Sequence, residues 1–354
     1  MFLKTIANQD KLFHKAIPAV PMGKYVHFVV LRETNSFSLF QTDQQLNFAR
    51  VTAGRDDTGP TTPISRIVMF KRKQTTPERL KGRELLRERG LLSADLKADN
   101  YCEYNSERFC KVCPDCIFYG FAIGNEGSER SKVLVDSAFS LSDYDESHQA
   151  MTFNAPHEHG TMSQYGVPKK SGFGEPQDHV LPQVFFPTIV TLRDATEAGF
   201  IYVLNNIMQT RRYGAQTTRT GTMENHLVAI IFANGEVFSN LKLTQTLYDN
   251  LKKGDDGKAI KGPYRATELV GKIEEALPTL LKDDKVIYEA LMAEALAKTV
   301  EEVGAIVSNE ATLTEILQQA YKESKAYAFE FGAKAPKGKG NDKGKGKTMA
   351  EKGE

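Results

Sequence analysis

The chain has 354 residues, which is long enough for one large domain or two smaller ones with a sizeable core. Its formal net charge of +1 argues against indiscriminate binding to nucleic acid, although a local basic surface is compatible with a defined groove. No apolar run approaches the roughly 20 residues of a membrane span, and residues 1–20 lack a signal-peptide core. We therefore expect a cytoplasmic protein with no membrane partner.

The charges are segregated along the chain. Residues 50–90 hold 11 Lys and Arg against 5 Asp and Glu, whereas residues 264–333 hold 7 against 13. The sequence therefore predicts a basic part and a separate acidic part.

The N-terminal half begins with two predicted strands. Residues 24–33 form a β-branched and aromatic run, and residues 64–70 form a shorter apolar run. The second run leads directly into a basic cluster of Lys71, Arg72 and Lys73.

A basic helix is predicted next. Thr76 supplies an N-cap followed by proline in the first turn, and Gly90 marks the end of the helix. Arg79, Arg83 and Arg87 recur every four residues along it, so they form one ridge. This ridge either is solvated or faces an anionic ligand.

All four cysteines lie between Cys102 and Cys116, in the spacing C-x7-C-x2-C-x2-C that includes Cys110 and Cys113. A cytoplasmic chain disfavours disulfides, and four thiolates this close suit a tetrahedral structural zinc ion. An iron–sulfur cluster is the chemical competitor, but the C-x3-C-P continuation typical of ferredoxins is missing after Cys116. Plain reduced thiols are the remaining alternative.

Strands are predicted at residues 132–139 and 184–192, with more than forty residues between them that are rich in Gly, Pro, His, Ser and Asp. A loop of this length inside a domain is usually functional or mobile. His157 and His159 flank a glutamate in this loop, but they lack a third ligand at helical spacing, so we expect a solvent-exposed loop there rather than a metal site.

A helix with apolar residues at helical spacing is predicted from residue 195 to Gln209. The loop that follows, residues 211–221, contains three arginines, two glycines, several hydroxyls and one tyrosine. Arginine forks pair with phosphate oxygens, glycines let the backbone approach a polyanion, and Tyr213 has a ring that could stack on a base. A solvated turn with scattered arginines is the alternative. Residues 227–232 and 236–241 flank Asn-Gly, which predicts a β-hairpin.

The C-terminal part is predicted to be helical from residue 266, and Thr312 with Glu315 forms a capping box that opens the last helix. Its apolar stripes are expected to pack on the sheet as core. Residues 335–354 are Lys-Gly repeats with almost no apolar side chains, so we expect a disordered tail.

The order strand, basic helix, strand, strand, helix, strand predicts an α+β protein with a ferredoxin-like (RRM-like) antiparallel sheet core. Residues 1–263 form this core, with a Cys-rich metal-binding insertion at 92–128 and a long insertion at 140–183. Residues 264–333 form a helical region, and 334–354 form the Lys/Gly tail. The sheet lacks the aromatic signature of RNA-recognition modules, which argues against a plain single-strand RNA reader.

Several segments occur in an order that resembles the repeated backbone subunit of CRISPR surveillance complexes, and most closely the RAMP-superfamily backbone subunit of type I-D Cascade. The cysteine run and the arginine-glycine loop are the most specific of them. The resemblance spans residues 24–241 and rests on the segments 37–43, 81–86, 110–120, 178–183 and 209–221.

The resemblance implies a non-catalytic subunit that polymerises along a CRISPR RNA for antiviral defence, with a thumb formed by the 140–183 insertion. Its implied partners are CRISPR RNA, target DNA or target RNA, further copies of itself in a helical filament, and other Cascade subunits. A coat of this kind needs sequence-independent grip, which phosphate contacts supply. The residues expected to bind RNA are Arg66, Lys71, Arg72, Lys73, Arg83, Arg211, Arg212, Tyr213, Gly214 and Arg219.

Related type III backbone subunits cut target RNA with an aspartate in the loop after the first strand, where this chain has Asp43. The alternative function is therefore a metal-dependent ribonuclease. Hydrolysis by a metal ion normally needs more than one carboxylate at the site, and residues 37–43 supply only Asp43, so we favour the binder.

Overall fold

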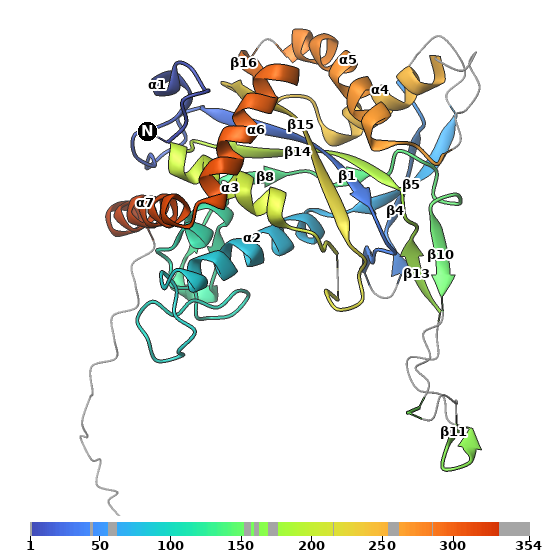
Figure 1. Cartoon of the computed structure of the whole chain (residues 1–354), viewed down its shortest axis with the longest axis horizontal. Coiled ribbons are helices and arrows are strands. Elements are labelled where there is room, and N and C mark those ends of the chain that lie inside the picture. Colours follow the sequence, from blue (N-terminus) through green and yellow to red (C-terminus); the bar gives the residue numbers. More distant parts are fainter. Residues whose placement is uncertain are drawn as a thin grey trace, which may run out of the picture.

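The computed structural model describes residues 2–42, 45–55, 62–151, 157–158, 163–168, 176–214, 216–253, 262–284 and 286–332. Its centre is a five-stranded antiparallel sheet in the order β16-β15-β1-β14-β8 (Figure 1). The strands are β1 (Tyr25–Thr34), β8 (Val133–Val135), β14 (Phe185–Arg193), β15 (Met223–Ala233) and β16 (Ile287–Leu291).

The long strands are apolar runs because both faces of the sheet are covered. Along β1, Phe28 and Val30 belong to one buried cluster and Val29 and Leu31 to another, as the alternation of side chains in a strand requires. The first face is covered by α2 (Lys71–Glu88) and α3 (Glu197–Gln209), together with α6 (Ala293–Ser308) and α7 (Glu310–Phe331). The opposite face is covered by α4 (Asn240–Lys253) and α5 (Ala266–Asp284), on the other side of the sheet from α2 and α3 in Figure 1.

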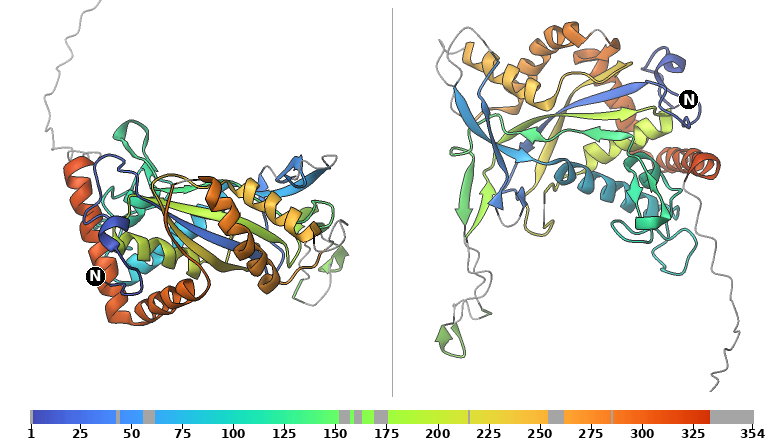
Figure 2. Two further views of the ribbon diagram at one scale, coloured as in Figure 1. Left: turned by 90° about the horizontal axis from the view of Figure 1, so that it is seen from above. Right: turned by 180° about the vertical axis from the view of Figure 1, so that it is seen from behind.

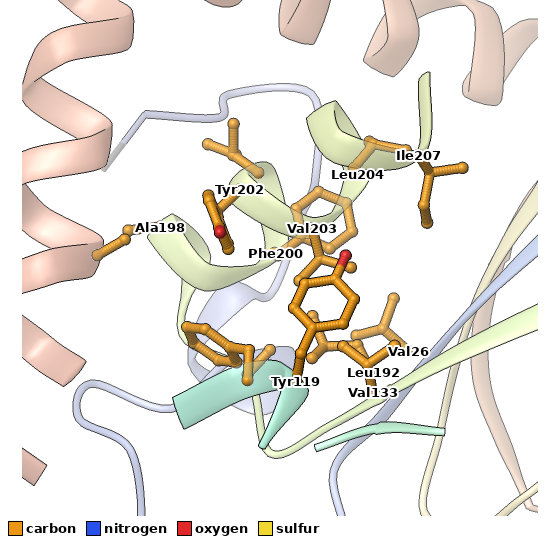
Figure 3. Packing of buried hydrophobic residues seen from close by; sticks show 14 of the residues in the cluster. Val26, Tyr119, Val133, Leu192, Ala198, Phe200, Tyr202, Val203, Leu204 and Ile207 are labelled. Carbon is orange, nitrogen blue, oxygen red and sulfur yellow. The ribbon is translucent and has the colours of Figure 1, made fainter. Parts of the chain in front are cut away.

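The core under α3 joins the sheet to that helix (Figure 3). Thr196 caps the helix by accepting a hydrogen bond from the Gly199 N–H at 3.2 Å, which explains where the helix begins. Phe200 packs its ring 5.4 Å from that of Phe28, and Val203 lies buried in the same cluster. These contacts fix α3, and with it the loop that follows.

Smaller sheets surround the central one. A three-stranded sheet of β4 (Phe48–Thr52), β5 (Pro63–Met69) and β9 (Ala138–Phe139) lies at the end of the molecule opposite to α6 and α7 (Figure 2), and a ribbon of β10 (His148–Met151) and β13 (Gln177–Val180) extends from the same end (Figure 1). The remaining elements are α1 (Gln9–Leu12), β2 (Gln41–Thr42), β3 (Gln45–Leu46), η1 (Asp115–Tyr119), β6 (Phe121–Ala122), η2 (Gly124–Glu126), β7 (Ser128–Glu129), β11 (Ser163–Gln164) and β12 (Val167–Pro168).

The structure confirms an α+β protein with antiparallel sheets and corrects two local predictions. The prediction of a hairpin at Asn-Gly, residues 234–235, is wrong, because the chain runs from β15 into α4 and β16 pairs with β15 instead. Asn240, the first residue of α4, ties this connection to β14, since its side chain accepts a hydrogen bond from the Ile189 N–H at 2.7 Å. The basic helix begins at Lys71 rather than Thr76, so Pro77 lies inside it.

Part of the long insertion (152–156, 159–162 and 169–175) and the tail (333–354) lie outside the described residues, as do Asp43 and His159. Within the described part of the chain, none of the helices is both long enough and apolar enough to span a membrane.

Candidate nucleic-acid interface and metal centre

Three basic side chains occupy the first turn of α2. Lys71 and Arg72 are exposed and Lys73 is half-buried, and the preceding residue, Phe70, has no side-chain group that could cap the helix. The unpaired N–H groups and the positive end of the helix dipole favour an anion at this position. Burial, and then the neighbouring charge of Arg72, lower the pKa of Lys73, so a phosphate would relieve a local excess of positive charge.

The loop at residues 210–222 docks onto this turn through Gly214. The Gly214 N–H donates to the Lys73 carbonyl at 3.2 Å. Pro77 makes that carbonyl available, because it lacks the N–H that would otherwise bond to the residue four positions earlier. Gly214 has a φ of +99° and pairs with Leu39 as an isolated bridge, and a Cβ on it would collide with the Leu39 carbonyl.

The same loop exposes Arg211, Arg212 and Arg219. Arg212 donates one hydrogen bond to the Thr220 carbonyl at 2.7 Å, which orients its guanidinium group along the loop. The bond between Gly214 and Lys73 places the loop beside the first turn of α2. We name the cations of these two segments the basic platform: Lys71, Arg72, Lys73, Arg211, Arg212 and Arg219. Six cations without a fixed base-reading geometry suit a phosphate backbone.

Tyr213 is fully buried, so its expected role in stacking on a base is corrected. Its hydroxyl donates to Glu78 Oε1 at 3.0 Å and accepts from the Asn225 side chain at 2.8 Å, while the Arg32 guanidinium lies 4.5 Å from the ring centre. Arg32 also pairs with Glu78 at 2.8 Å. Burial raises the pKa of Tyr213 and keeps the phenol protonated. The ring therefore anchors the loop to β1, α2 and β15.

Arg66 and Arg83 are also fully buried, so the structure corrects their assignment to RNA contact. Arg66 donates to the carbonyls of Ala53 and Ser140 at 2.6 and 2.7 Å, and burial lowers its pKa to about 10. Its guanidinium thus donates hydrogen bonds to buried backbone carbonyls that would otherwise lack a partner.

The four cysteines meet as the spacing predicts. The sulfur of Cys102 lies 4.0 Å from that of Cys113 and 3.6 Å from that of Cys116, and Cys110 lies 3.9 Å from Cys116. All four sulfurs lie within 4.8 Å of one another. Thiolates about 2.3 Å from a tetrahedral zinc ion are about 3.8 Å apart, whereas a disulfide needs about 2.05 Å, so the arrangement suits a metal ion.

Burial and hydrogen bonds among the thiols shift the pKa values of three of them, in opposite directions. Hydrogen bonds from Cys110, Cys113 and Cys116 lower the pKa of Cys102. Burial raises the pKa of the Cys113 and Cys116 thiols, which leaves those protons in place until a cation compensates the buried charge.

The predicted basic ridge on α2 holds the cysteine loop. Arg79 forms a bidentate pair with Asp115, with both N–O distances at 2.9 Å, and it donates to the Gly120 carbonyl at 2.8 Å. Arg83 contacts the same carboxylate. Asp115 stands between two cysteines in sequence, and it is the residue that sequence reasoning missed. Its signal was an acidic residue inside C-x2-C opposite a helix with arginines four residues apart.

Known proteins share the family and the fold of this chain. The sequence matches the Csc2 CRISPR family over residues 12–317. The chain belongs to the Csc2 CRISPR family. The structure is similar to the crystal structure of Thermofilum pendens Csc2, with a TM-score of 0.55 and 15% identity over 93% of this chain and 94% of that one. This likeness concerns the fold.

A chain of a CRISPR RNA-guided surveillance complex aligns with a TM-score of 0.44 and 11% identity, covering 80% of this Csc2-family chain and 98% of that chain. A chain of a type IV-B CRISPR complex aligns with a TM-score of 0.35 and 15% identity over 58% and 90% of the two chains. No curated protein sequence matches the chain significantly.

Proposed function

We propose that this Csc2-family chain is a non-catalytic backbone subunit that grips CRISPR RNA through the basic platform in a type I-D Cascade surveillance complex. The docking of the 210–222 loop on the first turn of α2 carries the proposal, because it joins two basic segments far apart in sequence. Family membership supplies the CRISPR context.

The coverage of the sheet favours this mode of RNA binding. Modules that read RNA on an open sheet stack bases on exposed aromatic residues of the strands. In this chain α4 and α5 occupy one face and α2 and α3 the other, so loops and a helix end are left to bind RNA. Such groups contact phosphates and not base edges, and this suits a coat that accepts any guide sequence.

The fold is assigned in the same proposal to the ferredoxin-like (RRM-like) class. The supporting observation is the order of β15, β1, β14 and β8, with α2 between β1 and β8 and α3 between β14 and β15. The proposal also includes structural zinc on the four cysteines, head-to-tail copies along the RNA, and target DNA and other Cascade subunits as further partners in the cytoplasm.

The test measures RNA affinity against salt concentration for two platform variants, Arg211→Ala/Arg212→Ala and Lys71→Ala/Arg72→Ala. Each variant should weaken the binding of unrelated single strands about equally. The slope of the logarithm of the binding constant against the logarithm of salt concentration, called the salt slope below, should fall in magnitude by about 1.4 if two phosphate contacts are lost. Lys322→Ala/Lys325→Ala removes two exposed charges on α7 and serves as the matched control. Slopes equal to that of the parent in both platform variants would rule out the basic platform as the RNA site.

The non-catalytic part of the proposal has its own test. Guide-loaded protein is incubated with end-labelled complementary RNA and a divalent ion, beside an Asp43→Ala variant. We expect intact RNA in both samples. Cuts at regular intervals that disappear with Asp43→Ala would establish the ribonuclease instead.

A further inference from the structure

A row of aromatic rings lies at the base of the β10–β13 ribbon and outside the basic platform. The ring of Phe48 in β4 lies 5.1 Å from that of Tyr144, and Tyr144 lies 4.0 Å from His148, the first residue of β10. Tyr144 and His148 are half-buried, whereas 59% of Phe48 is exposed. The row therefore ends in a ring that is open to solvent.

Hydrogen bonds hold the inner rings of the row. The Tyr144 N–H donates to the Ser65 carbonyl of β5 at 2.7 Å, and its hydroxyl donates to Asp178 of β13 at 3.4 Å. The Nδ1–H of His148 donates to the Tyr144 carbonyl at 2.7 Å. A row fixed in this way loses little conformational freedom when another flat ring stacks on Phe48.

A cation stands beside the open ring. Arg50 follows Phe48 by two residues on the same face of β4, about 7 Å along the strand, and its ladder partner is Ser65. It is exposed and forms no hydrogen bond or ion pair with any residue that the structure describes. A ring and a free guanidinium group at this separation match a nucleobase and a neighbouring phosphate.

Backbone pairings connect this row to the basic platform. His148 pairs with Val180, Val180 pairs with Ser38, and the next residue, Leu39, pairs with Gly214 of the platform loop. Neighbouring paired backbones lie about 5 Å apart. The aromatic row and the basic platform therefore lie within reach of one extended single strand.

We propose that Phe48, backed by Tyr144 and His148, stacks on one unpaired nucleobase of a bound single strand, with Arg50 on the adjoining phosphate. The inference rests on the proposed function and adds a base contact to it. Asp143, Asp145 and Glu146 lie in the loop that carries Tyr144, so they keep further phosphates away. Stacking therefore supplies most of the affinity at this site, and ion pairing supplies little.

The test uses the full chain and single-stranded RNA that contains 2-aminopurine, whose fluorescence falls when it stacks on an aromatic ring. Phe48→Ala should lower the affinity about tenfold with an unchanged salt slope, and should abolish the quenching at one probe position. Phe48→Tyr should restore both, because it retains a stacking face. Phe329→Ala removes another exposed ring, on α7, and should leave both unchanged.

Two arms identify the strand that supplies the base. The fluorescent base is placed in the guide in one arm and in the complementary target strand in the other, and quenching in either arm supports the stacking site. Parent-like affinity and quenching in Phe48→Ala would overturn the inference, as would weaker self-association with RNA affinity unchanged, which would make Phe48 a protein contact. Because Phe48 is uncharged, the Phe48→Ala test does not depend on the loss of salt dependence expected for Arg211→Ala/Arg212→Ala and Lys71→Ala/Arg72→Ala. Failure of this inference is therefore distinct from failure of the proposed function.

Discussion

At the scale of single residues, a proline and a glycine determine how the 210–222 loop is held. Pro77 lacks the N–H that would bond to the Lys73 carbonyl inside α2, so that carbonyl accepts a hydrogen bond from the Gly214 N–H instead. The loop is therefore docked by a backbone bond that does not depend on the arginines it presents. This separates the docking of the loop from its charge, so that each can be tested alone.

Gly214→Ala should detach the loop from α2. Its φ of +99° disfavours any side chain, and the new Cβ would meet the Leu39 carbonyl, which is backbone and cannot swing away. We expect a loss of about 1–3 kcal/mol in unfolding free energy and weaker RNA binding, measured by denaturant unfolding and by titration. Gly90→Ala is the control, since Gly90 has a φ of +70° but open space around its Cβ position. Equal losses of unfolding free energy in both variants would mean that the positive φ alone causes the loss, without the collision with the Leu39 carbonyl.

The buried histidine of β1 makes stability depend on pH. His27 accepts a hydrogen bond from the Thr191 hydroxyl at 2.8 Å and donates to the Gly235 carbonyl at 3.0 Å, and burial lowers its pKa from 6.5 to about 4. Between these two pH values the unfolded chain binds the proton and the folded chain does not. The unfolding free energy should therefore be fully retained above pH 6.5 and fall by about 3 kcal/mol as the pH drops to 4.

Denaturant unfolding at a series of pH values measures this contribution. His27→Gln should flatten the dependence between pH 6.5 and 4, although the variant is less stable throughout. His148→Gln serves as the control because His148 is half-buried at the surface. If the unfolding free energy of His27→Gln falls with pH as steeply as that of the parent, other groups cause the acid sensitivity.

At the scale of elements, α2 joins the two candidate sites. Its first turn carries three of the six cations of the basic platform, and Arg79 and Arg83, two and three turns further on, hold Asp115 between the cysteines. Removing one partner from a buried ion pair costs about 3–5 kcal/mol, so the helix and the cysteine loop are structurally interdependent. The loop around the sulfurs has little regular structure of its own, and a metal ion would supply the missing cohesion.

The purified protein should contain about one zinc ion per chain, as measured by elemental analysis. Cys113→Ser should lower that content and the melting temperature together, because metal binding is coupled to folding of the loop. Incubation of the parent protein with a chelator should lower the melting temperature in the same way. A preparation without zinc or iron that melts like the chelated sample would contradict a metal centre.

The sequence predicted those elements whose cause is local. The apolar runs of β1 and β14 follow from burial on both faces, and the cysteine spacing alone predicts the cluster of sulfurs. The burial of Arg83 was not predictable in this way, because it depends on Asp115, 32 residues further along the chain. The Asn-Gly turn signal failed for the same reason, since β16, more than fifty residues away, takes the edge that the hairpin strand would have occupied.

At the scale of the whole molecule, the end formed by α6 and α7 exposes more acidic than basic side chains. The helices α6 and α7 carry exposed acidic residues at the end of the molecule opposite to β4 and β5 (Figure 2): Glu301, Glu310, Glu315 and Glu330. A two-fold contact through this end would set these carboxylates against their own copies, which is unfavourable. Contacts between unlike surfaces avoid this repulsion, and they generate open filaments unless the rotation closes.

The number of copies should therefore grow with the length of the RNA. Native mass spectrometry of the protein loaded on single strands of increasing length should show integer additions of the chain, and a strand of twice the length should carry about twice as many copies. Arg211→Ala/Arg212→Ala should reduce occupancy at moderate salt without changing the spacing, because the variant loses phosphate contacts and keeps its contacts between copies. A fixed copy number at every RNA length would indicate a closed assembly and would contradict open contacts between unlike surfaces.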